Sequence, residues 1–292
     1  MEEIKFKIRG DDKIITETVP GGGFLSFLYG GNPIGKLSLF LLVKRKMFSV
    51  GFGKYMSSAM SKKKIAPFVQ KHKINLDEYV VPKDGYQSFN DFFYRNIKPE
   101  YRPIEEGVVS PADGRVVAFN ELSDTQKFFI KGSEFDLSSF LCDDSLASKY
   151  KGGAMMVVRL APVDYHRFHF PVTGKVSASK VIKGYYYSVS PLALRKKTEI
   201  FCQNQREYCV QSSEKNGDVL ICDVGATLTG GIIQTYKEGS FMEKGSEKGY
   251  FAFGGSTLIL LFEKGKIKFS DDLIKNTNEG YETFLKMGER IG

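Results

Sequence analysis

Six short runs of β-branched and aliphatic residues, separated by Gly, Asp and Pro, follow one another in the second part of this 292-residue chain. They cover residues 114–119, 154–160, 175–181, 208–212, 219–224 and 256–262. Runs of this length, bounded by turn residues, are typical of β-strands. Residues 219–222 and 258–262 are apolar throughout, which predicts strands buried on both faces. We therefore expect the chain to fold around a β-rich body.

The first hundred residues follow a different pattern. Short strands are expected at 5–9 and 13–19, before the turn Pro-Gly-Gly-Gly at 20–23, and a helical segment is expected to follow. Ser88 is suited to cap a helix that has Asp91 at its third position. We predict an α+β protein in which a mainly helical N-terminal segment, residues 1–97, precedes a β-rich sandwich-like or barrel-like body, residues 98–292. We also expect a short helix near 281–287.

The positive charge of the chain is concentrated in the N-terminal segment. The formal net charge is +8, yet residues 33–73 alone hold ten Lys or Arg and no Asp or Glu. Apolar residues recur there at helical spacing, namely Phe48, Phe52, Tyr55 and Ala59, flanked by Met56 and Met60. A basic amphipathic helix suits the surface of an anionic membrane, and a helix that packs on its own domain shows the same pattern. Nucleic-acid binding is disfavoured, because no nucleic-acid motif accompanies the charge.

Three further features of the sequence bear on where the protein is located and on the role of its cysteines. No stretch of 18 apolar residues is present, which argues against a membrane-spanning helix. The N-terminus lacks the apolar core of a secretory signal, so we expect a cytoplasmic location. The four cysteines lack CxxC spacing, and we expect them to serve packing.

Two of the three histidines lie close together in Asp164-Tyr165-His166-Arg167-Phe168-His169-Phe170-Pro171. A metal site would need further ligands, and the chain has no HExxH or CxxC motif, so we expect no bound metal. Two interpretations remain open for His166 and His169. Either their ring nitrogens form hydrogen bonds inside a core, or the side chains move protons, since an imidazole titrates near neutral pH.

An aspartate and a serine could act with these histidines. Asp113 lies in a tight turn before a strand, where a carboxylate can orient an imidazole. Ser256 follows Gly254 and Gly255 and begins an apolar run. The Ser256 hydroxyl could attack an external acyl group, as in a hydrolase, or the carbonyl of Gly255. The first is disfavoured because a nucleophile elbow, G-x-S-x-G, would need glycine where this chain has Leu258. The second is favoured because glycines tolerate strained backbone.

Four motifs, in this order, resemble the phosphatidylserine decarboxylase family, whose proenzymes cleave themselves to make a pyruvoyl cofactor. They are Pro111-Ala112-Asp113-Gly114, the Asp164 to Pro171 stretch, Asp223-Val224-Gly225-Ala226-Thr227 and Phe253-Gly254-Gly255-Ser256-Thr257. The resemblance covers residues from about 88 to 292. The cleavage tetrapeptide of the family is often Leu-Gly-Ser-Thr, and here Gly254 takes the place of the leucine. The Gly255-Ser256 pair is intact.

The resemblance implies roles for individual residues. Asp113 would orient His169, and His169 would take the proton of Ser256 as its hydroxyl attacks the carbonyl of Gly255. Cleavage would give chains 1–255 and 256–292 and convert Ser256 into a pyruvoyl cofactor. This cofactor would form a Schiff base with phosphatidylserine, and His166 would serve its decarboxylation to phosphatidylethanolamine. Because residues three apart point to opposite faces of a regular strand, we expect irregular backbone at 165–171.

The resemblance also implies partners. The N-terminal segment, residues 1–97, would dock peripherally on an anionic membrane that contains phosphatidylserine, at the cytoplasmic face of the cell membrane. The large and small chains would stay together, because residues 258–262 are too apolar to leave the core. We expect no nucleic-acid partner, and the sequence leaves a homodimer open. Basic residues near the motifs are candidates for phosphate contacts, namely Arg167, Arg195, Lys196 and Arg206.

The main alternative is a Ser/His/Asp hydrolase that acts on a membrane lipid or ester. Such an enzyme would remain a single chain of about 33 kDa and would react with a fluorophosphonate. A non-catalytic phospholipid-binding module would also stay intact but would not react. A pyruvoyl enzyme acting on a soluble amino acid would share the cleavage and leave the basic segment without a role.

Overall fold

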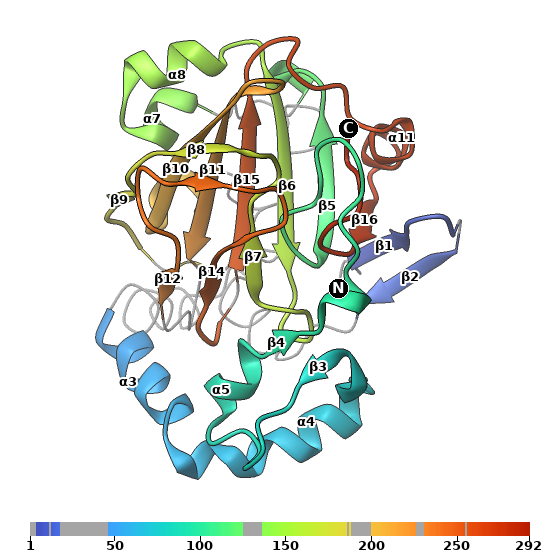
Figure 1. Cartoon of the computed structure of the whole chain (residues 1–292), viewed down its shortest axis with the longest axis vertical. Helices are drawn as coiled ribbons and strands as arrows, with labels where there is room; N and C mark the ends of the chain where they lie inside the picture. Colours follow the sequence, from blue (N-terminus) through green and yellow to red (C-terminus); the bar gives the residue numbers. More distant parts are fainter. Residues whose placement is uncertain are drawn as a thin grey trace, which may run out of the picture.

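The computed structural model describes residues 4–11, 13–17, 46–124, 136–185, 187, 200–225, 231–254 and 256–292. Three parts can be distinguished in Figure 1: a large β-sheet, a smaller sheet that covers one of its faces, and a helical lobe. The helical lobe comprises residues 46–101 and lies at the lower end of the molecule in this view. The mixed, β-rich character expected from the sequence is confirmed.

The large sheet has eleven strands within the described residues. They are β1 (Ile4–Ile8), β2 (Ile14–Glu17), β5 (Gly114–Phe119), β6 (Ala154–Leu160), β8 (Gly174–Val176), β9 (Lys180–Ile182), β10 (Arg206–Ser213), β11 (Gly217–Gly225), β13 (Phe241–Met242), β15 (Ser256–Phe262) and β16 (Glu282–Leu285). Their order is β13-β8-β10-β11-β15-β6-β5-β16-β1-β2, and β9 pairs with β10. The sheet ends at β13 and β2 and so stays open, which corrects the barrel-like alternative. The hairpin β1–β2 joins this sheet through β16, in parallel pairing.

The smaller sheet has the order β12 (Ile232–Gln234), β14 (Glu247–Phe251) and β7 (Arg167–His169). In the helical lobe, β3 (Tyr79–Val80) pairs with β4 (Asn96–Ile97). The α-helices of the described residues are α3 (Lys46–Met56), α4 (Ile65–His72), α5 (Phe89–Phe93), α7 (Leu137–Leu141), α8 (Asp144–Tyr150), α10 (Ile200–Gln203) and α11 (Asp271–Asn278). Short 3₁₀ helices are η2 (Ala59–Lys64), η3 (Leu76–Glu78), η4 (Pro99–Tyr101) and η5 (Leu122–Asp124).

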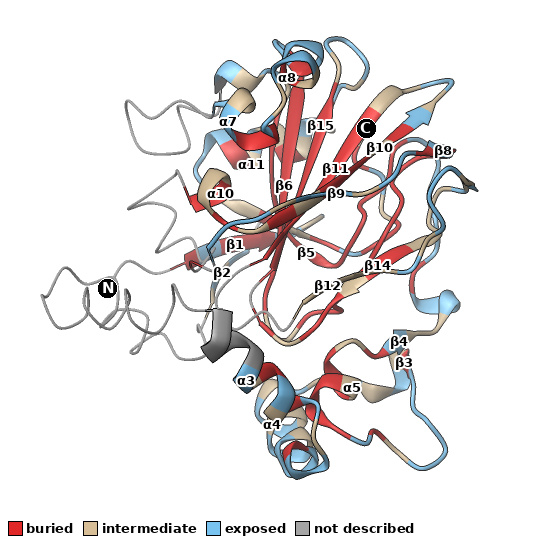
Figure 2. Ribbon diagram, turned by 90° about the vertical axis from the view of Figure 1, so that its left-hand side faces the viewer, coloured by how far each residue is buried: buried red, intermediate tan, exposed pale blue. Residues whose placement is uncertain are grey.

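Strand β15 lies inside the large sheet, between β11 and β6. All seven of its residues are buried, and residues 258–262 are 0% exposed. Figure 2 shows the central strands buried along most of their length. Odd-numbered residues of β15 pack in the apolar cluster on one face of the sheet, and even-numbered ones pack in the cluster on the other. The predicted burial on both faces is confirmed.

Local sequence patterns locate several strands correctly. The runs at 114–119, 154–160 and 256–262 coincide with β5, β6 and β15. The run at 175–181 is divided into β8 and β9, and between them the Ser177 hydroxyl accepts a hydrogen bond from the Val210 amide. The predicted helix near 281–287 is wrong. These residues form β16, whose alternating side chains Thr283 and Leu285 are buried, and whose partners are β1 and β5.

The helical lobe has a small aromatic core of its own. Ser88 Oγ accepts a hydrogen bond from the Asp91 amide (3.1 Å) and caps α5, as predicted. The buried residues of the core are Met56, Tyr86, Phe89, Phe92 and Phe93. Phe52 and Tyr55 pack against them from α3. The part of the apolar stripe on α3, namely Phe52, Tyr55 and Met56, therefore faces this core, whereas Ala59 and Met60 are exposed and the side chain of Phe48 lies outside the described residues.

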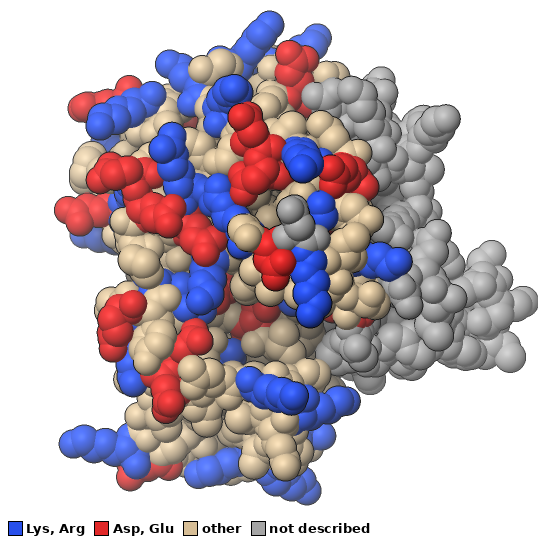
Figure 3. Space-filling model, turned by 90° about the vertical axis from the view of Figure 1, so that its right-hand side faces the viewer, with Lys and Arg blue, Asp and Glu red and all other residues tan. Residues whose placement is uncertain are grey.

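Exposed lysines occupy the outside of the helical lobe. They are Lys54 on α3, Lys62, Lys63 and Lys64 on η2, and Lys71 and Lys73 at the end of α4. Figure 3 shows Lys and Arg side chains around this lower part of the molecule. None of the helices in the described residues combines the length and the apolar character needed to cross a bilayer.

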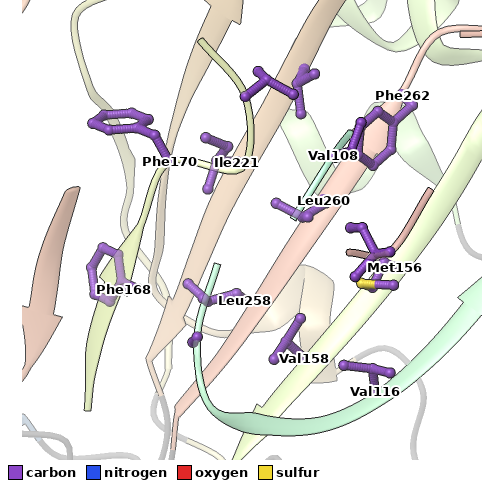
Figure 4. Close-up of a cluster of buried hydrophobic side chains, with 14 of the residues drawn as sticks. Val108, Val116, Met156, Val158, Phe168, Phe170, Ile221, Leu258, Leu260 and Phe262 are labelled. Atoms are coloured by element: carbon purple, nitrogen blue, oxygen red, sulfur yellow. The ribbon is translucent and has the colours of Figure 1, made fainter. Parts of the chain in front are cut away.

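An apolar core fills the space between the two sheets. Phe168 on β7 and the following Phe170 belong to one buried cluster with Ile221 and Leu258 of the large sheet. Figure 4 shows the two phenylalanines across from these aliphatic side chains. Because side chains alternate along a strand, the cluster fixes which face of β15 points toward the smaller sheet. Ser256 shares that face with Leu258.

Truncating the centre of β15 should reveal how strongly this core holds the strand. In a Ser256→Ala background, which is expected to keep the chain in one piece, Leu260→Ala should lower the free energy of unfolding by about 2–5 kcal/mol. Urea unfolding measures the loss. Met60→Ala, at a side chain that is 66% exposed, is the control and should change it by about 0.5 kcal/mol or less. A loss below about 1 kcal/mol for Leu260→Ala would contradict the packing described.

Candidate active site

Ser256 begins β15 and is completely buried. It pairs with Gly225 on β11 and with Leu160 on β6. Its Oγ has no hydrogen-bond partner among the described residues. A buried hydroxyl without a partner costs about 1–3 kcal/mol, so each such group calls for an explanation. Other buried polar atoms of the described residues also lack a partner, and Ser256 is distinguished from them by its position at the head of β15 after Gly254.

The segment before Ser256 is held by the helical lobe. The Phe253 amide donates a hydrogen bond to Asn90 Oδ1 (2.8 Å), and the Phe253 ring lies 5.0 Å from that of Phe93. Gly254 has a φ of 146°, in the region that favours glycine. Gly255 lies outside the described residues. The lobe thus positions the chain that leads to the Gly255-Ser256 peptide bond.

His166 is completely buried beside this segment. Its Nδ1 donates a hydrogen bond to the carbonyl of Asp164 (3.0 Å), and the centre of its ring lies 3.8 Å from that of the Phe93 ring, with the two planes tilted by 33°. Its Nε2 has no partner among the described residues. Burial lowers the pKa of His166 to about 3. The side chain is therefore a neutral imidazole at pH 7, with an unoccupied lone pair on Nε2.

His169 has partners for both of its ring nitrogens. Its Nδ1 donates to the carbonyl of Gly245 (2.9 Å), and its Nε2 accepts from the hydroxyl of Tyr165 (3.1 Å). Burial lowers the pKa of His169 below its ordinary value. The imidazole is therefore held in one tautomer. Its Nε2 can accept another proton only if the Tyr165 hydroxyl turns away.

Asp113 is bound to an arginine. Its carboxylate accepts hydrogen bonds from Arg102 Nε (2.9 Å) and from the Met287 amide (2.8 Å), and Arg102 Nη2 lies 2.5 Å from it. Asp113, His169 and Ser256 make no hydrogen bonds to one another in the described structure. The backbone does link His169 to the turn that carries Asp113, since the His169 amide donates to the carbonyl of Pro111 (2.8 Å).

The backbone around the two histidines is irregular, as predicted. Only residues 167–169 form the strand β7, so His166 lies before it. The pairing of β7 with β14 shifts register between Glu247 and Gly249. The two rings consequently have separate surroundings, with His166 against Phe93 and His169 against Tyr165.

Buried charges extend from this site to the N-terminal hairpin. Arg115 forms an ion pair with Asp164, the residue whose carbonyl binds His166, and lies 3.5 Å from Glu17. Arg159 in turn contacts Glu17 and Glu282, each at 2.6 Å. No motif singled out Glu17, because its partners are more than 90 residues away in the sequence. The loop that carries His166 is therefore braced by the first hairpin of the chain.

Several basic residues have structural partners. Arg206 is buried and donates to the carbonyls of Phe140, Cys202 and Asn204. Arg167 pairs with Glu247. Two of the four candidates for phosphate binding, Arg206 and Arg167, are therefore already bound to groups of the protein itself. The other two, Arg195 and Lys196, lie outside the described residues.

Arg95 is a buried site residue that sequence patterns did not single out. Its guanidinium donates to the carbonyl of Asp164 and to the hydroxyl of Tyr79, and it stacks at 4.2 Å on the Tyr79 ring.

No group of three or more His, Cys, Asp or Glu side chains in the described ranges is arranged to hold a metal ion.

The candidate site thus holds a buried serine and a buried neutral imidazole, each with a polar atom that has no partner among the described residues. Comparisons with known proteins identify the family. The sequence model of the family described as phosphatidylserine decarboxylase matches residues 89–292. The chain belongs to the phosphatidylserine decarboxylase family.

Curated relatives cover nearly the whole chain. A phosphatidylserine decarboxylase proenzyme of Fusobacterium nucleatum subsp. nucleatum is 51% identical and covers 100% of this chain and 98% of its own length. Proteins with the same description from Clostridium novyi and Ruminiclostridium cellulolyticum are 46% and 47% identical. Each alignment covers 94% of this chain, with 94% of the first relative and 93% of the second.

The depressed pKa of His166 should make stability depend on pH. Between pH 3 and the ordinary value of 6.5, the unfolded chain holds a proton on this side chain that the folded chain does not. The free energy of unfolding therefore rises with pH in this window, by up to about 1.4 kcal/mol per pH unit from this group. His166→Gln should flatten the curve between pH 4 and 6 in urea unfolding of the Ser256→Ala chain.

The surface residue His72 provides the control for this measurement. His72→Gln should leave the slope nearly unchanged, because His72 is only partly buried and its protonation differs less between the two states. Equal slopes for the His166→Gln chain and its parent would contradict the assigned state of His166.

Proposed function

We propose that this chain is a proenzyme that cleaves itself between Gly255 and Ser256 and then decarboxylates phosphatidylserine to phosphatidylethanolamine. The observation that carries the proposal is the buried, unpartnered Oγ of Ser256 at the head of β15. It is supported by membership of the family and by relatives described as phosphatidylserine decarboxylase proenzymes.

Self-cleavage begins when Ser256 Oγ attacks the carbonyl carbon of Gly255. His169 receives the hydroxyl proton after Tyr165 releases its Nε2. The C–N bond of the peptide breaks as a C–O ester bond forms, and the nitrogen takes the proton from His169 and remains on residue 256 as an amine. Loss of the α-proton of residue 256 then breaks the Cβ–O bond. Gly255 leaves as a carboxylate, and residue 256 becomes dehydroalanine. Water converts the dehydroalanine into a pyruvoyl group and ammonia.

Asp113 supports this step from a distance. Its loop is joined to the backbone of His169, and its charge favours the protonated imidazole. Arg102 holds the carboxylate in place through two of its nitrogens. Asp113 is therefore a positioning residue for His169 in the arrangement seen here.

The site fits a pyruvoyl group at residue 256. The Ser256 side chain has no hydrogen bond among the described residues, and its cross-strand neighbour Leu160 and Leu258 of the same strand belong to a buried apolar cluster. The pyruvoyl group supplies a ketone that condenses with the substrate amine and accepts the electrons left by carbon dioxide. His166 holds a free Nε2, which can take up a proton given up by the substrate ammonium and return it to the substrate carbon during decarboxylation. Contact with the Phe93 ring keeps the imidazole oriented.

Both chains would remain together after cleavage. Chain 256–292 contains β15, between β11 and β6, and β16, between β5 and β1. Glu282 of this chain contacts Arg159 of the other at 2.6 Å. After cleavage, Ser256 would lie in the small chain and Asp113, His166 and His169 in the large one.

Mass measurement tests the cleavage directly. The wild-type chain should separate under denaturing conditions into pieces of 255 and 37 residues, and the smaller piece should react with amine or hydride reagents at its ketone. Ser256→Ala should remain one chain of 292 residues and show no such reaction. Phosphatidylethanolamine formation should be lost with it.

Ser212→Ala, at an exposed serine on β10, is the matched control and should be cleaved like the wild type. An intact wild-type chain that a fluorophosphonate labels at Ser256 would instead identify the serine hydrolase. An intact and unlabelled wild-type chain would point to a lipid-binding module.

We also propose that the helical lobe docks the site on an anionic membrane, at the cytoplasmic face of the cell membrane. The support is the set of exposed lysines on η2 and α4, together with Met60, which is 66% exposed beside Lys62. Because the apolar side of α3 packs inside the lobe, attraction between the lysines and the lipid headgroups provides most of the binding.

Charge reversal at Lys62, Lys63 and Lys64 should weaken binding to vesicles that contain phosphatidylserine by at least about tenfold, since each lysine near such a surface contributes about 1 kcal/mol. Cosedimentation measures it. The control reverses three exposed lysines, Lys215 in the turn between β10 and β11 and Lys264 and Lys266 just after β15, and should bind like the wild type. These turns lie at the end of the large sheet away from the helical lobe (Figure 1). Unchanged binding of the first variant would refute the docking surface.

A further inference from the structure

A buried ion pair connects the two sheets next to the candidate active site. Lys248 on β14 pairs with Asp223 on β11, and both side chains are 0% exposed. Gln234 on β12 contacts both members, donating to Asp223 (2.7 Å) and accepting from Lys248 (3.0 Å). The Lys248 ammonium also lies 5.1 Å from the centre of the Phe168 ring. The pair therefore spans the apolar core between the sheets.

Each member of the pair lies beside a strand of the site. Lys248 is the extra residue at the register shift of β14, between Glu247, which faces His169, and Gly249, which faces Phe168. Asp223 faces Leu258 across β11 and β15, two residues from the position where Gly225 faces Ser256. Paired residues share a face of a sheet, so Asp223 and Ser256 point to the same side. The pair thus joins the strand next to His169 to the strand next to Ser256.

Stability alone gives little reason for such a pair. Replacing a buried ion pair by well-packed apolar residues is often neutral or stabilising, because two charges must be desolvated. Asp223 Oδ1 has no partner among the described residues, which adds to that cost. Burial alone would lower the pKa of Lys248, but the Asp223 carboxylate more than offsets this and raises it, so the ammonium stays charged.

We propose that Lys248 and Asp223 are positioning residues that fix the register and spacing of the smaller sheet over β15, so that His169 and Ser256 reach the geometry needed for self-cleavage. An ion pair bridged by Gln234 is directional, whereas apolar side chains allow sliding between the sheets. The inference rests on the proposed self-cleavage at Ser256 and extends it to residues that do not touch the reacting atoms.

Cell-free synthesis followed by a chase measures the rate of cleavage into the 255- and 37-residue chains. Asp223→Asn and the apolar double variant Asp223→Leu/Lys248→Met should cleave at least tenfold more slowly than the wild type, although the double variant should unfold at a similar or higher temperature. A double variant that is equally stable and cleaves within twofold of the wild-type rate would overturn the proposal.

Conservative variants separate positioning from mere packing. Asp223→Glu keeps the charge, so it should cleave faster than the isosteric Asp223→Asn. The reverse order would mean that only shape matters and would overturn the proposal. Asp218→Asn is the matched control: it removes one of the two carboxylates that pair with Lys149, at the exposed end of the same strand, and should cleave at the wild-type rate.

A further variant covers the case in which the double variant does not fold. Gln234→Leu leaves the ion pair in place and removes the amide that bridges it, so a several-fold slower cleavage is expected, and the wild-type rate would overturn the proposal. If the wild-type chain itself is never cleaved, the proposed function fails. If the wild-type chain is cleaved and the pair variants match it, only the role of the pair fails.

Discussion

The burial of β15 on both faces is the constraint on which the rest of the structure depends. Residues 258–262 are apolar and have no exposed surface, and each such side chain contributes about 1.5–3 kcal/mol when removed from water. A slip of one residue would move each side chain to the opposite face of the sheet, so the register with β11 and β6 is strongly determined. The direction of the Ser256 side chain follows from this register, because Ser256 begins the same strand.

The apolar surroundings give the few polar atoms of the site their importance. Ser256 Oγ and His166 Nε2 lack partners among the described residues, and the surrounding hydrophobic packing offsets the free energy that this costs. His169 and Asp113 differ, because each is bound by neighbours that must release it or hold it in place. The chain as described thus combines two unpartnered groups with two restrained ones.

Sequence patterns were sufficient where the determining contacts are local. The strands β5, β6 and β15 are runs of β-branched or aliphatic residues between turn residues, and the cap of α5 depends on Ser88 and Asp91 alone. The residues 281–287 could not be assigned in this way, because β16 is stabilised as a strand by β1, from the opposite end of the chain. The apolar side of α3 was equally ambiguous, since its amphipathic pattern fits a membrane and the aromatic core of the helical lobe alike.

In the candidate active site, too, the sequence located the residues but not the contacts between them. The motifs located Asp113, His166, His169 and Ser256 in the sequence, but they could not show that Asp113 is held by Arg102 or that Tyr165 occupies Nε2 of His169. Those contacts depend on side chains brought together by the fold. Glu17, which contacts Arg115 and Arg159, lies outside the region that the family's sequence model matches, so no motif could have indicated it.

The positions of β15 and β16 inside the large sheet have a consequence for the lifetime of the molecule. Residues 256–292 supply two separate strands, and each is inserted between neighbours from the remainder of the polypeptide. Withdrawing that 37-residue piece would split the large sheet at two places and expose four unpaired strand edges, which are prone to aggregate. Once nicked, the protein could not exchange this piece with another copy or regain it after heating. The lifetime of the cleaved protein would then be set by its rate of unfolding, and not by its equilibrium stability.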